Sequence, residues 1–303
     1  MPGLVPGIHD FSFTKQDVDA RHKAAHDETK TRAGSIPGPF VIVIALLAMT
    51  AIVCCRIGHD SRSPHVRMIF RCDPALADHL PRPAPARGLL PDWLRAMPAN
   101  AHSNIHGRDI RTVKQCPPFV DAMAYGVMIL LPCDITVDAG SFSWTWEIPE
   151  PQTAGHPRAP LSFHVPAQFA ATPLAQAGQA AIKFNSFWTI ELEQGWSLFA
   201  THPVNREDLP FRLISGLVDA DRFHDGGINF PALWTQPEFS GVLPKGTPVA
   251  QCFAVPRAAP ELVFESFDEA HKAAYEKTVA AVLAAPNVYR KRFRAKRGRS
   301  NAK

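Results

Sequence analysis

Short alternations of apolar and polar residues run through the second half of the chain and predict strands. The pattern starts near Cys116 and recurs at nearly even spacing, with Gly and Pro between the runs. Strands of this length and spacing are typical of a sandwich or a barrel, so the sequence predicts a mainly β domain over residues 68–265. The runs are "YGVMILLPCDITVDAGSFSWTWEIP" with a turn at "DAG", "LSFHVPAQ", "AIKFNSFWTIEL", "LISGLVDADRF", "GGINFPALWT", "GVLPKGTPVAQCFAVP" and "ELVFESF".

One segment has the pattern of a helix. "FDEAHKAAYEKTVAAVLAA" (267–285) begins with two acidic residues and is followed by Pro286. We expect its Ala, Val and Leu side chains to pack on the sheet, which gives a docked helix over residues 266–286. Ahead of the β region, "PDWLRAMP" has room for at most two helical turns. The sequence shows no βαβ alternation and no glycine-rich phosphate loop.

The segment "GPFVIVIALLAMTAIVCC" (38–55) contains no charged residue. As a helix it would span about 27 Å, just enough for the hydrocarbon core of a bilayer. One interpretation is a transmembrane helix over residues 38–57 behind a disordered polar N-terminus (1–37). Lys and Arg flank the segment on both sides, so no membrane orientation is predicted. The other interpretation is a translation start at Met68. In both cases the folded domain begins near Met68.

The net charge of +4 hides an uneven distribution. The final stretch, "YRKRFRAKRGRSNAK", holds eight Lys or Arg and no acid, which leaves 24 basic against 28 acidic residues elsewhere. We expect a disordered basic tail over residues 287–303, with contact to nucleic acid or to an anionic membrane as the alternatives. Six Cys residues without a CxxC pair predict buried, reduced thiols. The expected location of the main domain is therefore cytoplasmic, with a membrane anchor if residues 38–55 are translated.

Three pieces of the β region occur in an order that resembles the dUTPase and dCTP-deaminase superfamily. They are "EQGW" (193–196), "GLVD" (216–219) and "KGTPVAQ" (245–251). This resemblance implies a β-clip fold. A wider likeness is to an uncharacterised domain family of bacteria and tailed phages, and it implies a fold but no activity. It is carried by "KQCPPFVDAMAYGVMILLPCDI" (114–135), "FNSFWTIELEQGWSLF" (184–199) and "GLVDADRF" (216–223).

The superfamily resemblance also implies a set of site residues. A dUTPase-like enzyme uses a carboxylate base to activate a water against a phosphate held by Mg²⁺. Asp219 falls on the base position, and Asn205 and Arg206 are the candidate phosphate donors, with Asp221 and Arg222 as further ligand-binding candidates. Arg222 stands where the superfamily has a Tyr against the deoxyribose, and the C-terminal arm is basic instead of glycine-rich. Mg²⁺ is expected only under this enzymatic alternative.

The stretch "DADRFHDGG" (219–227) admits two interpretations. Its Asp and His side chains are metal-ligating types, and a His/Asp pair forms part of the facial triad of iron oxygenases. His224 and Asp225 are adjacent, however, so on a strand they point to opposite faces. The other interpretation, which we favour, is a wide polar turn. In that turn Asp221 pairs with Arg222, and the following Gly226–Gly227 has positive φ.

Three further features attract attention as sites. His102 and His106 are four residues apart and share a face if the segment is helical, but their surroundings favour a loop. Cys116 precedes two prolines, and we predict a rigid Pro-Pro turn that leads into a strand rather than a nucleophile. Alternation in "SFSWTWEI" puts Trp144 and Trp146 on one face, which predicts burial in the core or in a subunit interface.

The sequence therefore predicts a non-catalytic binding or assembly module on a β-clip-like fold. A homo-oligomer is expected, because β-clip relatives commonly form trimers around shared sites. A divergent dUTPase-like enzyme that binds or hydrolyses nucleotides stays open as the first alternative. A metal-dependent oxygenase stays open as the second. The sequence names no ligand.

Overall fold

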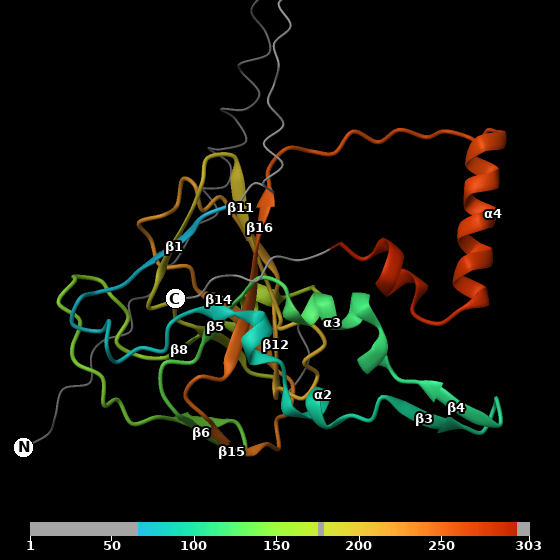
Figure 1. The fold of residues 1–303 in the computed structure, drawn as a ribbon. Coiled ribbons are helices and arrows are strands. Elements are labelled where there is room, and N and C mark those ends of the chain that lie inside the picture. Colours follow the sequence, from blue (N-terminus) through green and yellow to red (C-terminus); the bar gives the residue numbers. More distant parts are fainter. Residues whose placement is uncertain (1–65, 175–178, 296–303) are drawn as a thin grey trace, which may run out of the picture. The chain divides into compact units, whose positions relative to one another are not determined.

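The computed structural model describes residues 66–174 and 179–295 (Figure 1). Within them the chain is mainly β, as predicted, and its strands form five small antiparallel sheets. In the described part of the chain these sheets do not close into the barrel that was one expectation from the strand spacing. No helix in that part is long and apolar enough to cross a membrane, and the segment 38–55 lies outside it.

The largest sheet has five strands in the order β13-β11-β16-β5-β2. Its longest strand, β16, lies between β11 and β5, and β11 pairs with β13 on its other side. The register places Phe199 of β11 opposite Leu217 on one side and Phe253 on the other. The strands are β13 (Gly216–Val218), β11 (Trp196–Thr201), β16 (Pro248–Pro256), β5 (Val127–Leu130) and β2 (Ala84–Pro85).

The remaining strands form four smaller sheets. The four-stranded sheet contains β12 (Phe211–Leu213), β14 (Phe230–Trp234), β9 (Ala181–Phe184) and β8 (Leu161–Phe163). The three-stranded sheet contains β15 (Ser240–Leu243), β6 (Ile135–Asp138) and β7 (Ser141–Ser143). Two strand pairs complete the set: β1 (Met68–Arg71) with β10 (Thr189–Leu192), and β3 (Asn100–Ser103) with β4 (Arg108–Arg111).

One apolar core joins four of these sheets, and the pair β3 and β4 contributes no residue to it. In β6 the buried Ile135 and Val137 alternate with exposed Thr136 and Asp138, as the period-two pattern predicts. The predicted turn at "DAG" follows directly, with Ala139 and Gly140 both at positive φ. The largest fully buried apolar side chains of this core include Trp234, Phe184, Phe211 and Phe230. Each contributes roughly 1.5–3 kcal/mol by its removal from water.

The tryptophans of "SFSWTWEI" lie beyond the end of β7 at Ser143, but the predicted alternation continues, since Trp144 and Trp146 are partly buried and Thr145 between them is exposed. Trp144 packs against the main core, whereas Trp146 packs against a second, smaller cluster and contacts Phe187 with ring centroids 5.3 Å apart. The two rings therefore contact different apolar clusters.

The Pro-Pro segment forms a helix and not the turn that we predicted. α3 (Pro117–Ala124) has the proline pair in its first turn, where a missing N–H costs no hydrogen bond. Cys116 precedes this helix and is exposed, while Cys133 and Cys252 are buried as expected. The short α2 (Asp92–Ala96) agrees with the prediction. Single turns complete the helices: η1 (Ala86–Leu89), η2 (Val113–Gln115), η3 (Pro166–Phe169) and η4 (Tyr289–Phe293).

The chain after β16 differs most from expectation. The run "ELVFESF" forms no strand, and its apolar side chains are exposed. The predicted helix is present as α4 (Glu269–Ala284), and the carboxylate of Asp268 accepts a hydrogen bond from the N–H of His271 at its start. None of the residues of α4 is buried, so the structure does not show the docked contact that we expected.

Candidate functional site

Two polar clusters lie at opposite ends of β11. The first consists of Gly195, Ser197, Asp219, Asp221 and Arg257, at the end of β11 near Trp196. We call it the arm-root cluster, because the long segment after β16 starts at Arg257. The second, the loop cluster, lies beyond Thr201 at the other end. It consists of Trp93, His202, Val204, Arg206, Asp208 and Gln251.

In the arm-root cluster one guanidinium bridges two carboxylates. Arg257 follows β16 directly, and its N–H donates to the carbonyl of Gly195 (2.9 Å). Its Nη1 lies 3.2 Å from Oδ1 of Asp219, and its Nη2 contacts Oδ2 of Asp221. The Ser197 hydroxyl donates to Oδ1 of Asp219 (2.7 Å), and the N–H of Gly195 donates to Oδ2 of Asp221 (2.9 Å).

These donors stabilise both carboxylates in the charged form. The hydrogen bond from Ser197, followed by the charge of Arg257, holds the pKa of Asp219 below its ordinary value. The N–H of Gly195 and then Arg257 lower the pKa of Asp221. The Asp219 side chain is 50% exposed, whereas that of Asp221 is 5% exposed. Oδ1 of Asp221 is buried and has no hydrogen-bond partner among the described residues.

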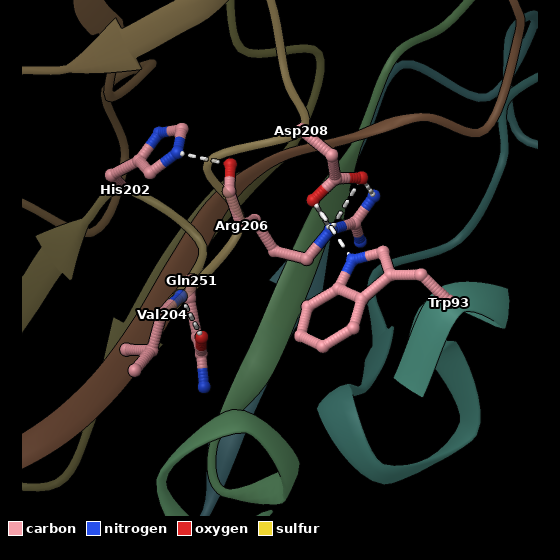
Figure 2. A network of polar contacts seen from close by, with 6 residues as sticks. All are labelled: Trp93, His202, Val204, Arg206, Asp208 and Gln251. Carbon is pink, nitrogen blue, oxygen red and sulfur yellow. Dashed lines mark hydrogen bonds and ion pairs between the residues drawn. The ribbon is translucent and has the colours of Figure 1, made fainter. Parts of the chain in front are cut away.

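The loop cluster ties the segment 202–208 to the body (Figure 2). Nε of Arg206 donates to both carboxylate oxygens of Asp208 (2.9 and 3.1 Å), and Nη2 adds a third bond of 2.9 Å. The indole of Trp93 donates to the same carboxylate (3.2 Å). Burial by itself would raise the pKa of Asp208, but the hydrogen bonds and charge of Arg206 outweigh it and leave the pKa below its ordinary value.

Gln251 anchors the same loop from within the sheet. Its side chain is fully buried, and its Oε1 accepts the N–H of Val204 (2.8 Å). Its Nε2 donates to the carbonyls of Ala122 (3.0 Å) and Tyr125 (2.6 Å), at the end of α3. One amide therefore joins the loop, β16 and α3.

His202 is held in one tautomer. Its Nδ1 accepts the N–H of Leu213 (3.2 Å), so Nε2 carries the proton that is donated to the carbonyl of Arg206 (3.0 Å). The bond from Leu213 requires the neutral ring, because a protonated Nδ1 cannot accept. Burial lowers the pKa of His202, which keeps the ring neutral.

The predicted site residues are divided between the two clusters. Asp219 and Asp221 lie in the arm-root cluster, while Asn205 and Arg206 belong to the loop at the other end of β11. Five residues of strand correspond to roughly 16 Å, so within one chain the candidate base and the candidate phosphate donors are not brought together. Arg206 is also committed to Asp208. Arg222 is exposed, and its backbone N–H donates to the carbonyl of Asp219 (2.9 Å).

The segment 219–227 is a turn, as we favoured, but with different internal contacts. Asp221 pairs with Arg257 and not with Arg222, which is a correction to the prediction. The positive φ expected for Gly226–Gly227 is also absent. The ring of the exposed Phe223 instead lies against Gly226, where a Cβ would be 2.3 Å from it, so a side chain at this position would have to displace the ring. The side chains of His224 and Asp225 meet (Nε2 to Oδ2, 3.3 Å), so they do not point to opposite faces.

A surface feature that sequence reasoning missed crosses the large sheet. Leu217, Phe199, Phe253 and Tyr125 form what we call the aromatic row. The register aligns the first three, and ring centroids are 6.3 Å apart between Phe199 and Phe253 and 5.9 Å apart between Phe253 and Tyr125. Leu217, Phe199 and Tyr125 are exposed, and Phe253 is partly buried.

The close approach of two chain segments completes the row. Gly126 follows Tyr125 at φ +80°, and a Cβ at this position would lie 2.4 Å from the carbonyl oxygen of Cys252. Only glycine fits this geometry. The sequence offered only the pair "YG" before an apolar run. Nothing in that pair shows that Gly126 lies against Cys252 of β16.

A cleft of about 340 Å³ lies elsewhere, lined in part by Arg71, Asp73, His156, Phe187, Trp188 and Asp225. Its volume is at the low end for ligand pockets. Asp73 accepts N–H groups of Ala75 (2.9 Å) and Thr153 (2.6 Å) with its two oxygens, so it holds the cleft walls. We assign this cleft no ligand.

The metal interpretation gains no support from the geometry. Within residues 66–174 and 179–295, no group of three or more His, Cys, Asp or Glu side chains is placed to hold a metal ion. His102 lies in β3 and pairs with Asp109 across the hairpin (3.3 Å), while His106 lies in the turn. These two histidines are thus not on a helix.

Comparison with known proteins gives no family. The chain matches no protein-family model and no curated protein.

Proposed function

We propose that this protein is a non-catalytic assembly module that associates with copies of itself, on a β-clip-like fold. The fold proposal is supported by the order of the three pieces noted in the sequence. "EQGW" leads into β11, and "GLVD" and "KGTPVAQ" contribute to β13 and β16, the two strands that flank β11.

The observation that carries the function is the aromatic row. Four large apolar side chains lie side by side across the sheet, and those of Leu217, Phe199 and Tyr125 are exposed while Phe253 is partly buried. Contiguous exposed apolar surface of this kind marks interaction sites, and aromatic residues are enriched in the buried centre of protein interfaces. A second copy of the chain supplies an equally apolar surface at equal concentration.

The two polar clusters support a non-catalytic reading. A general base works best with a pKa near the operating pH, yet the pKa of Asp219 is lowered by Ser197 and Arg257. Arg206 would have to leave Asp208 before it could bind a phosphate. Asp219, through Arg257, and Arg206, through Asp208, each join separate parts of the chain.

One observation favours the nucleotide-binding alternative. Oδ1 of Asp221 is buried and unpartnered, beside a second carboxylate, and it offers an acceptor to a ligand N–H or ammonium group. Mg²⁺ would belong only to this alternative. We rank it second because Asn205 and Arg206 lie at the far end of β11.

Sedimentation velocity of the full chain tests the assembly proposal. We expect an oligomer at micromolar concentration and a shift towards monomer when Leu217→Lys places a charge in the row. Val242→Lys is the matched control, because Val242 is an exposed apolar residue of a different sheet. A wild-type chain that sediments as a monomer, or a Val242→Lys variant that dissociates equally, would contradict the proposal.

A further inference from the structure

We infer that residues 258–287 of one copy cover the aromatic row of a second copy, and the reverse, so that two chains exchange these segments. We call residues 258–287 the arm. This inference rests on the proposed self-association and names the surfaces that take part in it.

The arm carries apolar side chains that the described chain leaves exposed. None of its residues is buried, although it contains the run "ELVFESF" and, on α4, apolar side chains at positions i, i+4 and i+7 from Tyr275. The rings of Phe267 and Tyr275 contact each other at 5.6 Å and join the run to the helix. The exposed apolar side chains are Leu262, Val263, Phe264, Phe267, Tyr275, Val279, Val282 and Leu283.

The arm is fixed at both ends to the body. At its start, Arg257 binds Gly195, Asp219 and Asp221. Beyond its end, Val288 is buried and Arg294 makes two hydrogen bonds to Asp121 of α3 (2.8 and 2.5 Å). A segment fixed at both ends has less conformational freedom to lose on binding than a loose chain end has.

The geometry of the root points to a second copy as the partner. The arm leaves β16 at Arg257, and β16 also carries Phe253 of the aromatic row. Arg257 lies four residues after Phe253, so in a twofold pair that brings the two Arg257 residues close together each arm is within reach of the row of the other copy. Such an interface is isologous, because the same two surfaces of each chain meet.

The area agrees with this partner. Eight exposed apolar side chains present on the order of 1,000 Å² per arm, and a stable interface needs about 800 Å² per partner.

A photo-cross-linking experiment on mixed copies tests the exchange. Full chains with p-benzoylphenylalanine in place of Phe264 are mixed with ¹⁵N-labelled wild-type chains and irradiated. We expect cross-links from the arm to peptides that contain Phe199, Leu217 or Phe253 of the labelled copy. The same group in place of Ile105 is the control, since Ile105 is 92% exposed and Phe264 is 91% exposed.

Each outcome decides a different question. Cross-links to the row of the same chain only would overturn the exchange, because the arm would then cover its own body. An oligomer whose arm cross-links avoid the row would also overturn it, while the proposed self-association would stand. A monomer with no intermolecular product would overturn both.

A second measurement does not depend on photochemistry. Phe264→Ser should raise the dissociation constant of the oligomer tenfold or more, while Ile105→Ser leaves it unchanged. Both residues are exposed, so neither variant should disturb the fold of the single chain, which far-UV circular dichroism checks. Equal dissociation constants for the two variants would overturn the exchange.

Discussion

The two ends of β11 use the same kinds of side chain for different purposes. In the loop cluster, an Arg–Asp pair, a neutral His and a buried Gln satisfy one another and fix a turn. In the arm-root cluster, Arg257 bridges one half-exposed and one buried carboxylate, and one carboxylate oxygen is left over. Acids and arginines near each other in a sequence therefore say little about chemistry until their partners are known.

The largest loss of stability is expected from a change at Gln251 in the loop cluster. Gln251→Leu removes three hydrogen bonds and leaves the N–H of Val204 and two carbonyls of the α3 end unsatisfied in the interior. We expect a loss of about 3–5 kcal/mol in the free energy of unfolding. Urea denaturation measures it, with Gln115→Leu as the control because Gln115 is only partly buried. A loss below about 1 kcal/mol would mean that Gln251 does not hold the loop.

Arg206 comes next in size. Arg206→Met removes the multiple hydrogen bonds to Asp208 but keeps the length of the side chain, and we expect a cost of about 1–2 kcal/mol. Arg212→Met is the matched control, since Arg212 is 63% exposed and makes one contact, to Glu207 (3.2 Å). Equal midpoints in urea for the two variants would mean that the Arg206–Asp208 pair stabilises the fold no more than an exposed ion pair. The loop cluster would then not be a structural cross-link.

The third test uses pH. Burial lowers the pKa of His202 below the 6.5 of the unfolded chain, so below pH 6.5 the unfolded state binds a proton that the folded state does not. The contribution of His202 is thus complete above pH 6.5 and falls as the pH drops towards the folded pKa. We expect His202→Gln to flatten the decrease in melting temperature between pH 7 and pH 5. An unchanged slope would show that His202 does not titrate in this way.

Asp219 should give the smallest effect on stability. Asp219→Asn keeps an acceptor for Ser197, and Asp221 still holds Arg257, so we expect an unchanged melting temperature and an unchanged oligomer. Thermal-shift titrations with nucleotides and Mg²⁺ then compare the variant with wild type. A Mg²⁺-dependent shift that occurs only in the wild type would favour the nucleotide-binding alternative and would make the arm-root cluster a site.

The sequence was informative where a signal is local. The alternation of Ile135 and Val137 identified β6, "DAG" identified its hairpin turn, and Pro286 marked the region where α4 ends. Partners far along the chain were not visible. Asp219 was correctly placed at a strand end, but its contact with Arg257 depends on β13 and β16 pairing with the same strand.

The wrong predictions share a physical cause. "ELVFESF" has the composition of a strand, but it pairs with no strand within the described chain, and propensity alone does not form a sheet. The proline pair before "FVDAMA" suggested a turn, although the first turn of a helix accepts proline equally well. In both cases the neighbours of the segment decide the structure.

The two attachments of the arm also determine how the protein bears force. A pull on Arg294 loads its pair with Asp121 and the buried Val288 before the strands of the large sheet. Once these contacts and the bond between Arg111 and Asn287 yield, the thirty residues of the arm extend to a length of about 100 Å before tension reaches Arg257 and β16. Residues 288–295 can thus move a long distance before the large sheet is loaded.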